Sequence, residues 1–177
     1  MMRQVRYVEQ RDPLAVPLLA ELAVEYSSRY GGTAAEVRRD LTAYPAAEFT
    51  PPDGALLVVV EDGEPVAGGA FRRYDAGTAE LKRIWTARDH RRRGLGRFVL
   101  AELEAEIARR GYVRVYLTTG PRQPEAVALY NAAGYTALER NIQHEIGPLH
   151  RFEKHLPDSG PARPRGAGDT GVHAGNS

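Results

Sequence analysis

Two apolar runs on either side of an Asp-Gly pair place the tightest limit on how this chain can fold. Residues 55–60 read ALLVVV, residues 65–71 read PVAGGAF, and Asp62-Gly63 lies between them. An Asp-Gly pair in this setting is typical of a tight β-hairpin, because both residues tolerate the positive φ that the turn requires. The sequence therefore predicts two antiparallel strands that are neighbours in a sheet.

Helical periodicity is found in four other segments. Apolar side chains share one face at Leu14, Leu18, Leu22 and Tyr26 in the first segment and at Leu95, Phe98, Val99, Leu103 and Ile107 in the third. Thr33 is the predicted N-cap of the second helix, and Gly111 is the predicted end of the third. The fourth helix is predicted to open at Pro124 and to close at Gly134.

Further strands are predicted at 4–9, 77–87, 112–119 and 150–156, which gives the order β, α, α, three strands, α, β, α and one or two closing strands. A chain of 177 residues with 42% hydrophobic content can bury one core. We expect one α/β domain with a mixed sheet over residues 1–156. Residues 157–177 hold three prolines, five glycines and a single large aliphatic side chain, so we expect a disordered tail.

Charge and cysteine content exclude several classes of protein. The formal net charge is only +1, so the whole chain is not a polycation for nucleic acid, although five arginines gather between residues 88 and 97. There is no cysteine, which excludes disulfides and thiolate nucleophiles. We expect a cytoplasmic, soluble protein, because the first residues lack the apolar core of a secretory signal and no apolar run is long enough to span a membrane.

The arginine cluster surrounds a glycine-rich turn at the start of the third predicted helix. Arg91-Arg92-Arg93-Gly94-Leu95-Gly96 would present unpaired backbone amides at the positive end of the helix dipole, which is an arrangement that binds anions. A P-loop is excluded because no Lys-Ser/Thr follows, and a dinucleotide fingerprint would need glycine where Val99 stands. A solvated surface run of arginines is the alternative reading of these residues.

A second block follows in the fourth predicted helix, Leu129-Tyr130-Asn131-Ala132-Ala133-Gly134-Tyr135. Together, the glycine turn and this block resemble the signatures of the GNAT superfamily of acetyl-CoA-dependent N-acetyltransferases. The resemblance extends over about residues 3–156. The resemblance implies a mostly antiparallel sheet of six to seven strands flanked by about four helices. It also implies that the strand before the turn splays from its neighbour to receive the pantetheine arm. The implied cofactor-binding residues are Ile84, Trp85, Thr86, Arg91, Arg92, Arg93, Gly94, Leu95, Gly96, Arg97 and Gln123, the last standing where the family often has Asn.

Catalytic roles follow from the same resemblance and from the chemistry of acyl transfer. Tyr130 is the candidate acid that protonates the departing thiolate, and Glu80 is the candidate base, acting directly or through water. The absence of cysteine favours direct attack by the amine in a ternary complex. Alternation along the strand predicts that Glu80, Lys82 and Ile84 share a face, with Arg83 and Trp85 on the other, so a plain Glu80–Lys82 ion pair is the alternative for Glu80.

The acceptor is predicted to be a primary amine, either on a small molecule or exposed on a protein. Tyr26, Tyr30 and Tyr74 are the candidate acceptor-site residues, and no metal is expected because His144, His150 and His155 lack ligand spacing. Neither nucleic acid nor membrane is an expected partner, and a homodimer is possible. The alternative functions are a non-catalytic acyl-CoA-binding module and nucleic-acid binding through the arginines.

Overall fold

The computed structural model describes residues 2–43, 45–139, 142–144 and 147–157. The predicted disordered tail lies, apart from Pro157, outside the described residues. The elements in chain order are β1 Arg3–Tyr7, a 3-10 turn Pro13–Ala15, α1 Val16–Tyr30, α2 Ala34–Ala43, a 3-10 turn Ala46–Phe49, β2 Ala55–Glu61, β3 Glu64–Asp75, β4 Thr78–Thr86, a 3-10 turn Arg88–His90, α3 Leu95–Arg109, β5 Arg114–Thr119, α4 Pro124–Ala132, β6 Thr136–Ala137 and β7 His150–His155.

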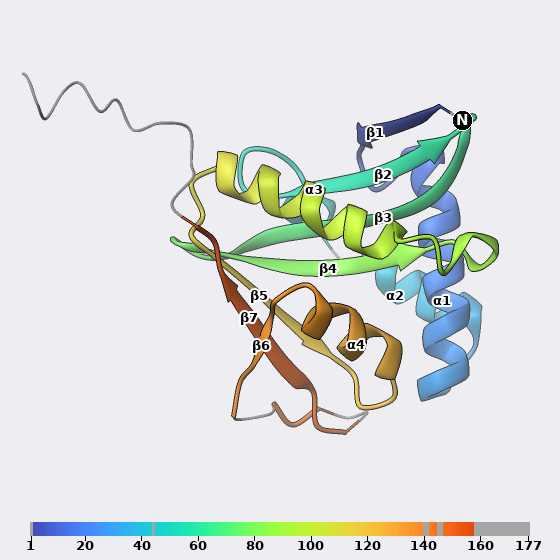
Figure 1. Ribbon diagram of the computed structural model, residues 1–177. Coiled ribbons are helices and arrows are strands. Elements are labelled where there is room, and N and C mark those ends of the chain that lie inside the picture. The colour runs from blue at the N-terminus through green and yellow to red at the C-terminus, as the bar shows by residue number, and fades with distance from the viewer. Residues whose placement is uncertain (1, 44, 140–141, 145–146, 158–177) are drawn as a thin grey trace, which may run out of the picture.

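The strands form one seven-stranded sheet in the order β1-β2-β3-β4-β5-β7-β6 (Figure 1). Every neighbouring pair is antiparallel except β4 and β5, which run parallel. The predicted mixed, mostly antiparallel sheet with four α-helices is therefore confirmed.

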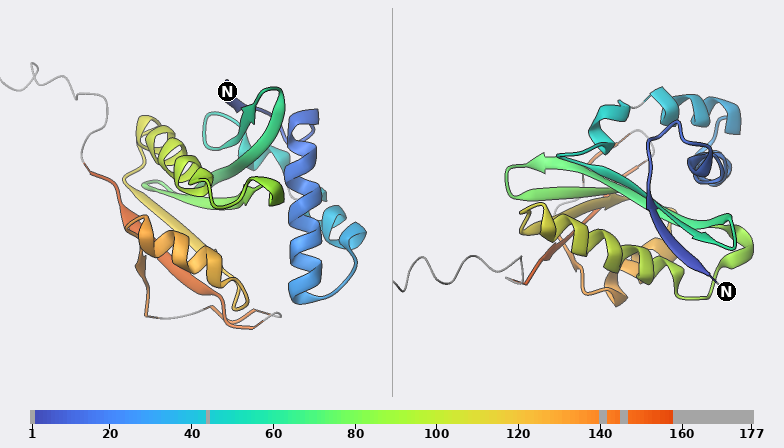
Figure 2. Two further views of the ribbon diagram at one scale, coloured as in Figure 1. Left: turned by 45° about the vertical axis from the view of Figure 1, so that its right-hand side comes forward. Right: turned by 90° about the horizontal axis from the view of Figure 1, so that it is seen from above.

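Helices cover both faces of the sheet (Figure 2). On one face, α1 packs Leu18 and Leu22 against Leu56 of β2 and Trp85 of β4. On the other face, α3 and α4 lie over the sheet, and α3 buries an apolar stripe that includes Leu103. These two apolar clusters, one on each face of the sheet, hold β4 and the loop after it in position.

The hairpin that the sequence predicts is present between β2 and β3. Asp62 and Gly63 have φ values of 50° and 87°, so both occupy the left-handed region that a two-residue turn needs. All seven residues of β2 are buried, which explains why its sequence is a continuous apolar run rather than an alternating one.

A β-bulge in β4 overturns the predicted alternation of its side chains. Arg83 has a φ of 60°, and the two residues Arg83 and Ile84 stand opposite the single residue Gly69 of β3. A bulge inserts one extra residue and so changes which side chains share a face. Ile84 therefore packs on the α3 side against Leu103, not beside Lys82 as the alternation predicted. Arg83 instead lies on the α1 and α2 side, where its guanidinium sits 5.1 Å from the centre of the Phe49 ring.

The sheet opens between β4 and β5. Their parallel ladder covers only three residue pairs, from Thr78↔Arg114 to Glu80↔Tyr116. Within the described residues 81–86 and 117–119 the two strands make no further pairs, and Figure 1 shows β5 leaving β4 at this end, with α4 beside the gap. The predicted splay of the strand before the glycine turn is thus present.

Candidate active site

A cavity of about 490 Å³ lies where β4 and β5 have separated. Its walls come from α1, the end of β4, the loop before α3, the end of β5 and α4. The lining residues are Leu22, Glu25, Tyr26, Arg29, Leu81, Lys82, Arg83, Ile84, Trp85, Thr86, Arg91, Arg92, Thr118, Thr119, Gln123, Glu125, Ala126, Leu129 and Tyr130. The structure thus brings together eight of the residues singled out from the sequence: Tyr26, Ile84, Trp85, Thr86, Arg91, Arg92, Gln123 and Tyr130.

The start of α3 lies beside this cavity and has no side-chain cap. Gly94 is the N-cap residue with a φ of 75°, and Arg92 also has a positive φ, of 64°. Phe98 is the first residue whose amide bonds back into the helix, to the Gly94 carbonyl. The helical amides before it have no acceptor within the helix, and such amides at helix N-termini can bind anions. Gly96 has no Cβ, which lets α3 approach Leu129 of α4 closely.

The three consecutive arginines of the loop have different environments. Arg93 donates to Glu61 of β2 with Nη2 2.8 Å from Oε1, and its Nη1 lies 2.8 Å from His90 Nδ1. Arg3 of β1 binds the same carboxylate, which is buried. Burial would raise the pKa of Glu61, but hydrogen bonds from Arg93 and Arg3 outweigh it and lower the pKa below the ordinary glutamate value. The Arg93 side chain therefore anchors the loop to the sheet.

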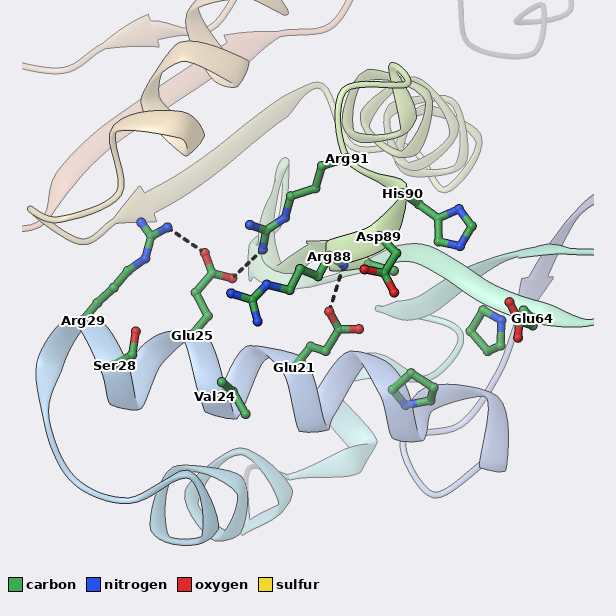
Figure 3. A pocket seen from close by; sticks show the side chains of 13 residues that line it. Glu21, Val24, Glu25, Ser28, Arg29, Glu64, Arg88, Asp89, His90 and Arg91 are labelled. Atoms are coloured by element: carbon green, nitrogen blue, oxygen red, sulfur yellow. Dashed lines mark hydrogen bonds and ion pairs between the residues drawn. The ribbon is translucent and has the colours of Figure 1, made fainter.

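Arg91 lies between the active-site cavity and a second hollow. This hollow, of about 660 Å³, lies between α1 and the loop after β4 (Figure 3). There Glu25 of α1 contacts Arg29 at 3.1 Å and Arg91 at 3.9 Å, and Glu21 accepts a hydrogen bond from the Arg88 amide. These contacts tie the loop between β4 and α3 to α1, at Arg88 and Arg91.

Tyr130 is buried on the α4 wall of the cavity. Its ring packs against Tyr135 and Phe152, with ring centres 5.6 and 6.0 Å apart. Burial, with a smaller contribution from the nearby Tyr26, raises the pKa of Tyr130 well above the ordinary tyrosine value. Burial, followed by Glu25, raises the pKa of Tyr26 to about 12. Both phenols are therefore fully protonated donors near neutral pH.

Glu80 is buried but does not line the cavity. Its Oε1 accepts from Arg72 Nε at 2.7 Å, while Lys82 Nζ lies 3.9 Å from Oε2. Arg72 also binds Glu48 at 2.8 Å. The Glu80–Lys82 ion pair that the sequence offered as the alternative is therefore present, and Arg72 of β3 is a second, closer cation. The role of Glu80 as a base stays a prediction.

Gln123 is held in one orientation by two hydrogen bonds to its side-chain oxygen. Oε1 accepts from the Gly120 amide at 3.0 Å and from the Tyr30 hydroxyl at 3.3 Å. A backbone N–H can only donate, so the oxygen must face Gly120 and the Nε2 amide must face away. A methyl group at Gly120 would collide with the Tyr30 hydroxyl. Tyr30, predicted as an acceptor contact, is therefore packed against the β5–α4 loop and does not line the cavity.

Tyr74 is not brought to the cavity either. It is 47% exposed near the end of β3, which pairs with the first residues of β4, whereas the cavity lies at the other end of β4. Its ring lies against that of Tyr116 at a tilt of 37°, with centres 4.7 Å apart.

Several polar residues of the cavity wall were missed in the sequence. The bulge turns Arg83 to the side where Lys82 lies, the splay of β5 exposes Thr118 and Thr119 to the cavity, and α1 and the N-terminus of α4 add Glu25, Arg29 and Glu125. A signal for Thr118 and Thr119 was available. They are the last two residues of the predicted strand 112–119, which lies beside the strand that was expected to splay.

Leu95 of the predicted cofactor set is a core residue, with 1% of its surface exposed, and the Arg97 guanidinium reaches the Ala132 carbonyl of α4 at 3.5 Å. Among the residues that the structure describes there is no cluster of side chains that could hold a metal ion. In the same part of the chain no helix combines the length and apolar character that a membrane crossing requires.

Comparison of the sequence with known proteins identifies the family. The sequence profile of the Acetyltransferase (GNAT) family matches residues 18–135. The uncharacterized N-acetyltransferase YsnE of Bacillus subtilis is 33% identical over 81 residues, which is 44% of this chain and 54% of YsnE, so the chain spans about half of that relative's length.

Solved structures agree with this match. A Klebsiella pneumoniae protein described as an acyl-CoA N-acyltransferase superposes with a TM-score of 0.69 at 27% identity, covering 88% of this chain and 99% of that one. YncA of Salmonella typhimurium, solved with its cofactor acetyl-CoA, has the same fold with a TM-score of 0.67 at 18% identity, covering 91% and 98% of the two chains. With the family profile matched over more than half of its length, the chain belongs to the GNAT family of acetyltransferases.

Proposed function

We propose that this protein transfers an acetyl group from acetyl-CoA to a primary amine, by direct attack within a ternary complex. The observation that carries the proposal is the cavity between the separated strands, which has the uncapped start of α3 at one side and the buried residue Tyr130 in its wall.

The residues present fit the cofactor. The amides at the start of α3 and the side chains of Arg91 and Arg92 would hold the phosphates, since both an uncapped helix start and guanidinium groups bind phosphate oxygens. Backbone groups of Ile84, Trp85 and Thr86, which β5 does not pair, would take the amide groups of the pantetheine arm. Gln123 Nε2, which makes no hydrogen bond with the described residues, would donate to the same arm.

The chemistry requires a neutral amine and a proton for the departing sulfur. Acetyl-CoA supplies a thioester that is already activated for attack. Tyr130 donates its proton to the leaving thiolate. Burial raises the pKa of this phenol, so it is protonated at neutral pH. No thioacyl-enzyme forms, because the chain has no cysteine.

Glu80 is the proposed base for the acceptor ammonium. Since Glu80 lies outside the cavity wall, the proton would reach it through water. The pH profile of kcat/KM for Glu80→Gln decides this role: a profile that matches the wild type removes Glu80 from the reaction.

A direct assay tests the whole proposal. Purified protein is given acetyl-CoA and a panel of small amines, and released CoA is detected with a thiol reagent, which the cysteine-free protein cannot consume. Calorimetric titration with acetyl-CoA, CoA, NAD and ATP accompanies the assay. We expect binding of acetyl-CoA and CoA only, with CoA release that depends on the amine. Tight binding without product from any amine would instead indicate a non-catalytic acyl-CoA-binding module.

A further inference from the structure

The cavity wall contains a primary amine of its own. Of the 24 lysine and arginine residues in the chain only two are lysines, Lys82 and Lys154. Lys82 lines the cavity between β4 and β5, and its side chain is 31% exposed. A protein proposed to acetylate primary amines therefore carries one in the wall of the cavity proposed for the reaction.

The ion pair between Lys82 and Glu80 is a loose one. Lys82 Nζ lies 3.9 Å from Glu80 Oε2, a distance that is too long for a hydrogen bond. Arg72 Nε binds the other oxygen of the same carboxylate at 2.7 Å. Glu80 therefore keeps a closer cation when Lys82 loses its charge.

The surroundings of Lys82 favour the neutral amine. Burial is the main cause that lowers the pKa of Lys82 below the ordinary lysine value, and Arg72 and Arg83 act in the same direction. Glu80 and Glu48 raise the pKa but do not cancel these effects. A larger share of this amine is therefore unprotonated at neutral pH than of a lysine in water, and the unprotonated amine is the form that attacks a thioester.

The sequence of β4 places Lys82 close to the groups proposed to bind acetyl-CoA. Ile84, the first residue proposed to bind the pantetheine arm, follows Lys82 by two positions, about 7 Å along a strand. A lysine amine stands on a flexible four-carbon stem and can extend over much of that length. Tyr130, the proposed acid, lines the same cavity from α4. The amine, the proposed acid and the backbone groups proposed for the cofactor thus belong to one cavity.

Lys154 of β7 has very different surroundings. Its Nζ donates to Glu104 Oε1 at 2.8 Å and to the Ala133 carbonyl at 2.9 Å, and it lies 5.6 Å from the centre of the Tyr135 ring. Lys154 is not among the residues that line the cavity. Both hydrogen bonds would have to break before its nitrogen could attack a thioester.

We propose that Lys82 is an internal acceptor, which the protein acetylates with its own bound acetyl-CoA when no other amine is present. This inference rests on the proposed acetyl transfer. The Lys82 ammonium loses one proton through water, the nitrogen bonds to the acetyl carbon, the carbon–sulfur bond breaks, and Tyr130 protonates the sulfur. The second proton of the nitrogen leaves through water and restores Tyr130. The products are the Nε-acetylated side chain, CoA and one proton.

Acetylation changes the cavity in two ways. The ammonium becomes a neutral amide, which ends the ion pair with Glu80, and the added acetyl group takes up space in a cavity of about 490 Å³. Both changes hinder a second amine from binding. We therefore expect the modified protein to turn over more slowly, so that it loses activity when acetyl-CoA is present and the acceptor is scarce.

Mass spectrometry of the intact protein and of its peptides tests the proposal. Purified protein is incubated with acetyl-CoA at neutral pH with no added amine. We expect one acetyl group per chain, on Lys82, together with one equivalent of CoA. Lys154 should gain less than about a tenth as much, because hydrogen bonds to a charged group are stronger than neutral ones and must break first. Peptide mapping separates both lysines from the N-terminal amine.

Variants assign the acetylation to the cavity. Tyr130→Phe should slow the acetylation of Lys82 by about 10² to 10⁴, the usual range for a general acid. Lys82→Arg keeps the positive charge and should gain no acetyl group in the cavity, whereas the matched Lys154→Arg should be acetylated as the wild type is. After incubation with acetyl-CoA, turnover of the fastest amine of the panel should fall for the wild type and stay constant for Lys82→Arg.

A mixing experiment separates transfer within one chain from transfer between chains. Isotope-labelled wild type is mixed with unlabelled Tyr130→Phe, and the two proteins are distinguished by mass. We expect the acetyl group on the labelled chain alone, because each cavity serves its own Lys82. Equal acetylation of the two proteins would show transfer between chains and would overturn the internal acceptor.

The remaining outcomes separate this inference from the proposed function. An unmodified Lys82, with CoA release that depends on an added amine, overturns the internal acceptor and leaves acetyl transfer standing. Label shared equally between the two lysines, or a Tyr130→Phe rate equal to that of the wild type, indicates acetylation outside the proposed machinery and also overturns it. Turnover that stays constant while Lys82 is acetylated overturns the loss of activity. Absence of CoA release with every amine, together with an unmodified Lys82, overturns both proposals.

Discussion

Tyr130 is the residue on which the proposed reaction depends most. Its ring packs against Tyr135 and Phe152, and the residue lines the cavity where β4 and β5 part. Burial disfavours the phenolate, so the phenol keeps its proton near neutral pH. In the proposed reaction this proton goes to the departing thiolate.

Tyr130→Phe removes the proton and keeps the ring. We expect kcat to fall by about 10² to 10⁴, the usual range for a general acid, with the affinity for acetyl-CoA unchanged by calorimetric titration. Tyr7→Phe, which changes an exposed tyrosine of β1, is the matched control. A wild-type kcat in the Tyr130 variant would show that the sulfur leaves without this proton.

At the scale of elements, α1 joins the two walls that the splay separates. It contacts β4 through its apolar face, and its last residues reach the β5–α4 loop, where Arg29 donates to the Arg122 carbonyl at 2.7 Å and to Glu125. Tyr30 completes the link by its hydrogen bond to Gln123.

Tyr30→Phe tests whether this link orients Gln123 for the cofactor. Loss of one neutral hydrogen bond is worth about 0.5–1.5 kcal/mol, so we expect KM for acetyl-CoA to rise about 2- to 12-fold while kcat changes little. Gln123→Ala should raise the same KM, and the double variant should be no worse than Gln123→Ala alone, because both changes act through one amide. Additive effects would show that Tyr30 acts independently of Gln123.

Glu61 of β2 links a second set of elements, because it pairs with Arg3 of β1 and with Arg93 of the loop before α3. Because the folded-state pKa of Glu61 is lowered, its contribution to stability is complete above the ordinary value of 4.5 and is lost as the pH falls through the lowered value. The free energy of unfolding of the wild type should exceed that of Glu61→Gln by a constant amount near neutral pH, and the difference should shrink below about pH 4.5. Urea unfolding across this range measures it, with the exposed Glu64→Gln as control. A difference that does not vary with pH would mean that the charge of Glu61 is not what holds the loop.

Over the whole molecule, the residues themselves predicted the features that depend on neighbouring positions. Features that depend on distant positions were predicted where the family resemblance implied them, as for the splay of β4 and β5, and were otherwise missed. Asp62-Gly63 and the Thr33 cap, which the structure shows accepting from the Glu36 amide at 3.1 Å, are local signals. The bulge at Arg83 has no such signal, because it requires Gly69 on another strand. The same limit explains why the sequence did not separate the structural Arg93 from its neighbours, since its partner Glu61 lies 32 positions away.

The parting of β4 and β5 leaves a sheet that is incomplete by itself. Beyond Glu80 and Tyr116 the facing edges of these two strands make no ladder pairs with each other, and the proposed cofactor would bond to the backbone groups there as an extra strand does. A ligand that binds only the folded chain stabilises it by mass action, by about 2.7 kcal/mol at a hundred times its dissociation constant. The midpoint of thermal unfolding should then rise by ~5–10 °C with saturating acetyl-CoA and not with NAD. The lifetime of this protein would therefore follow the supply of the thioester that it consumes.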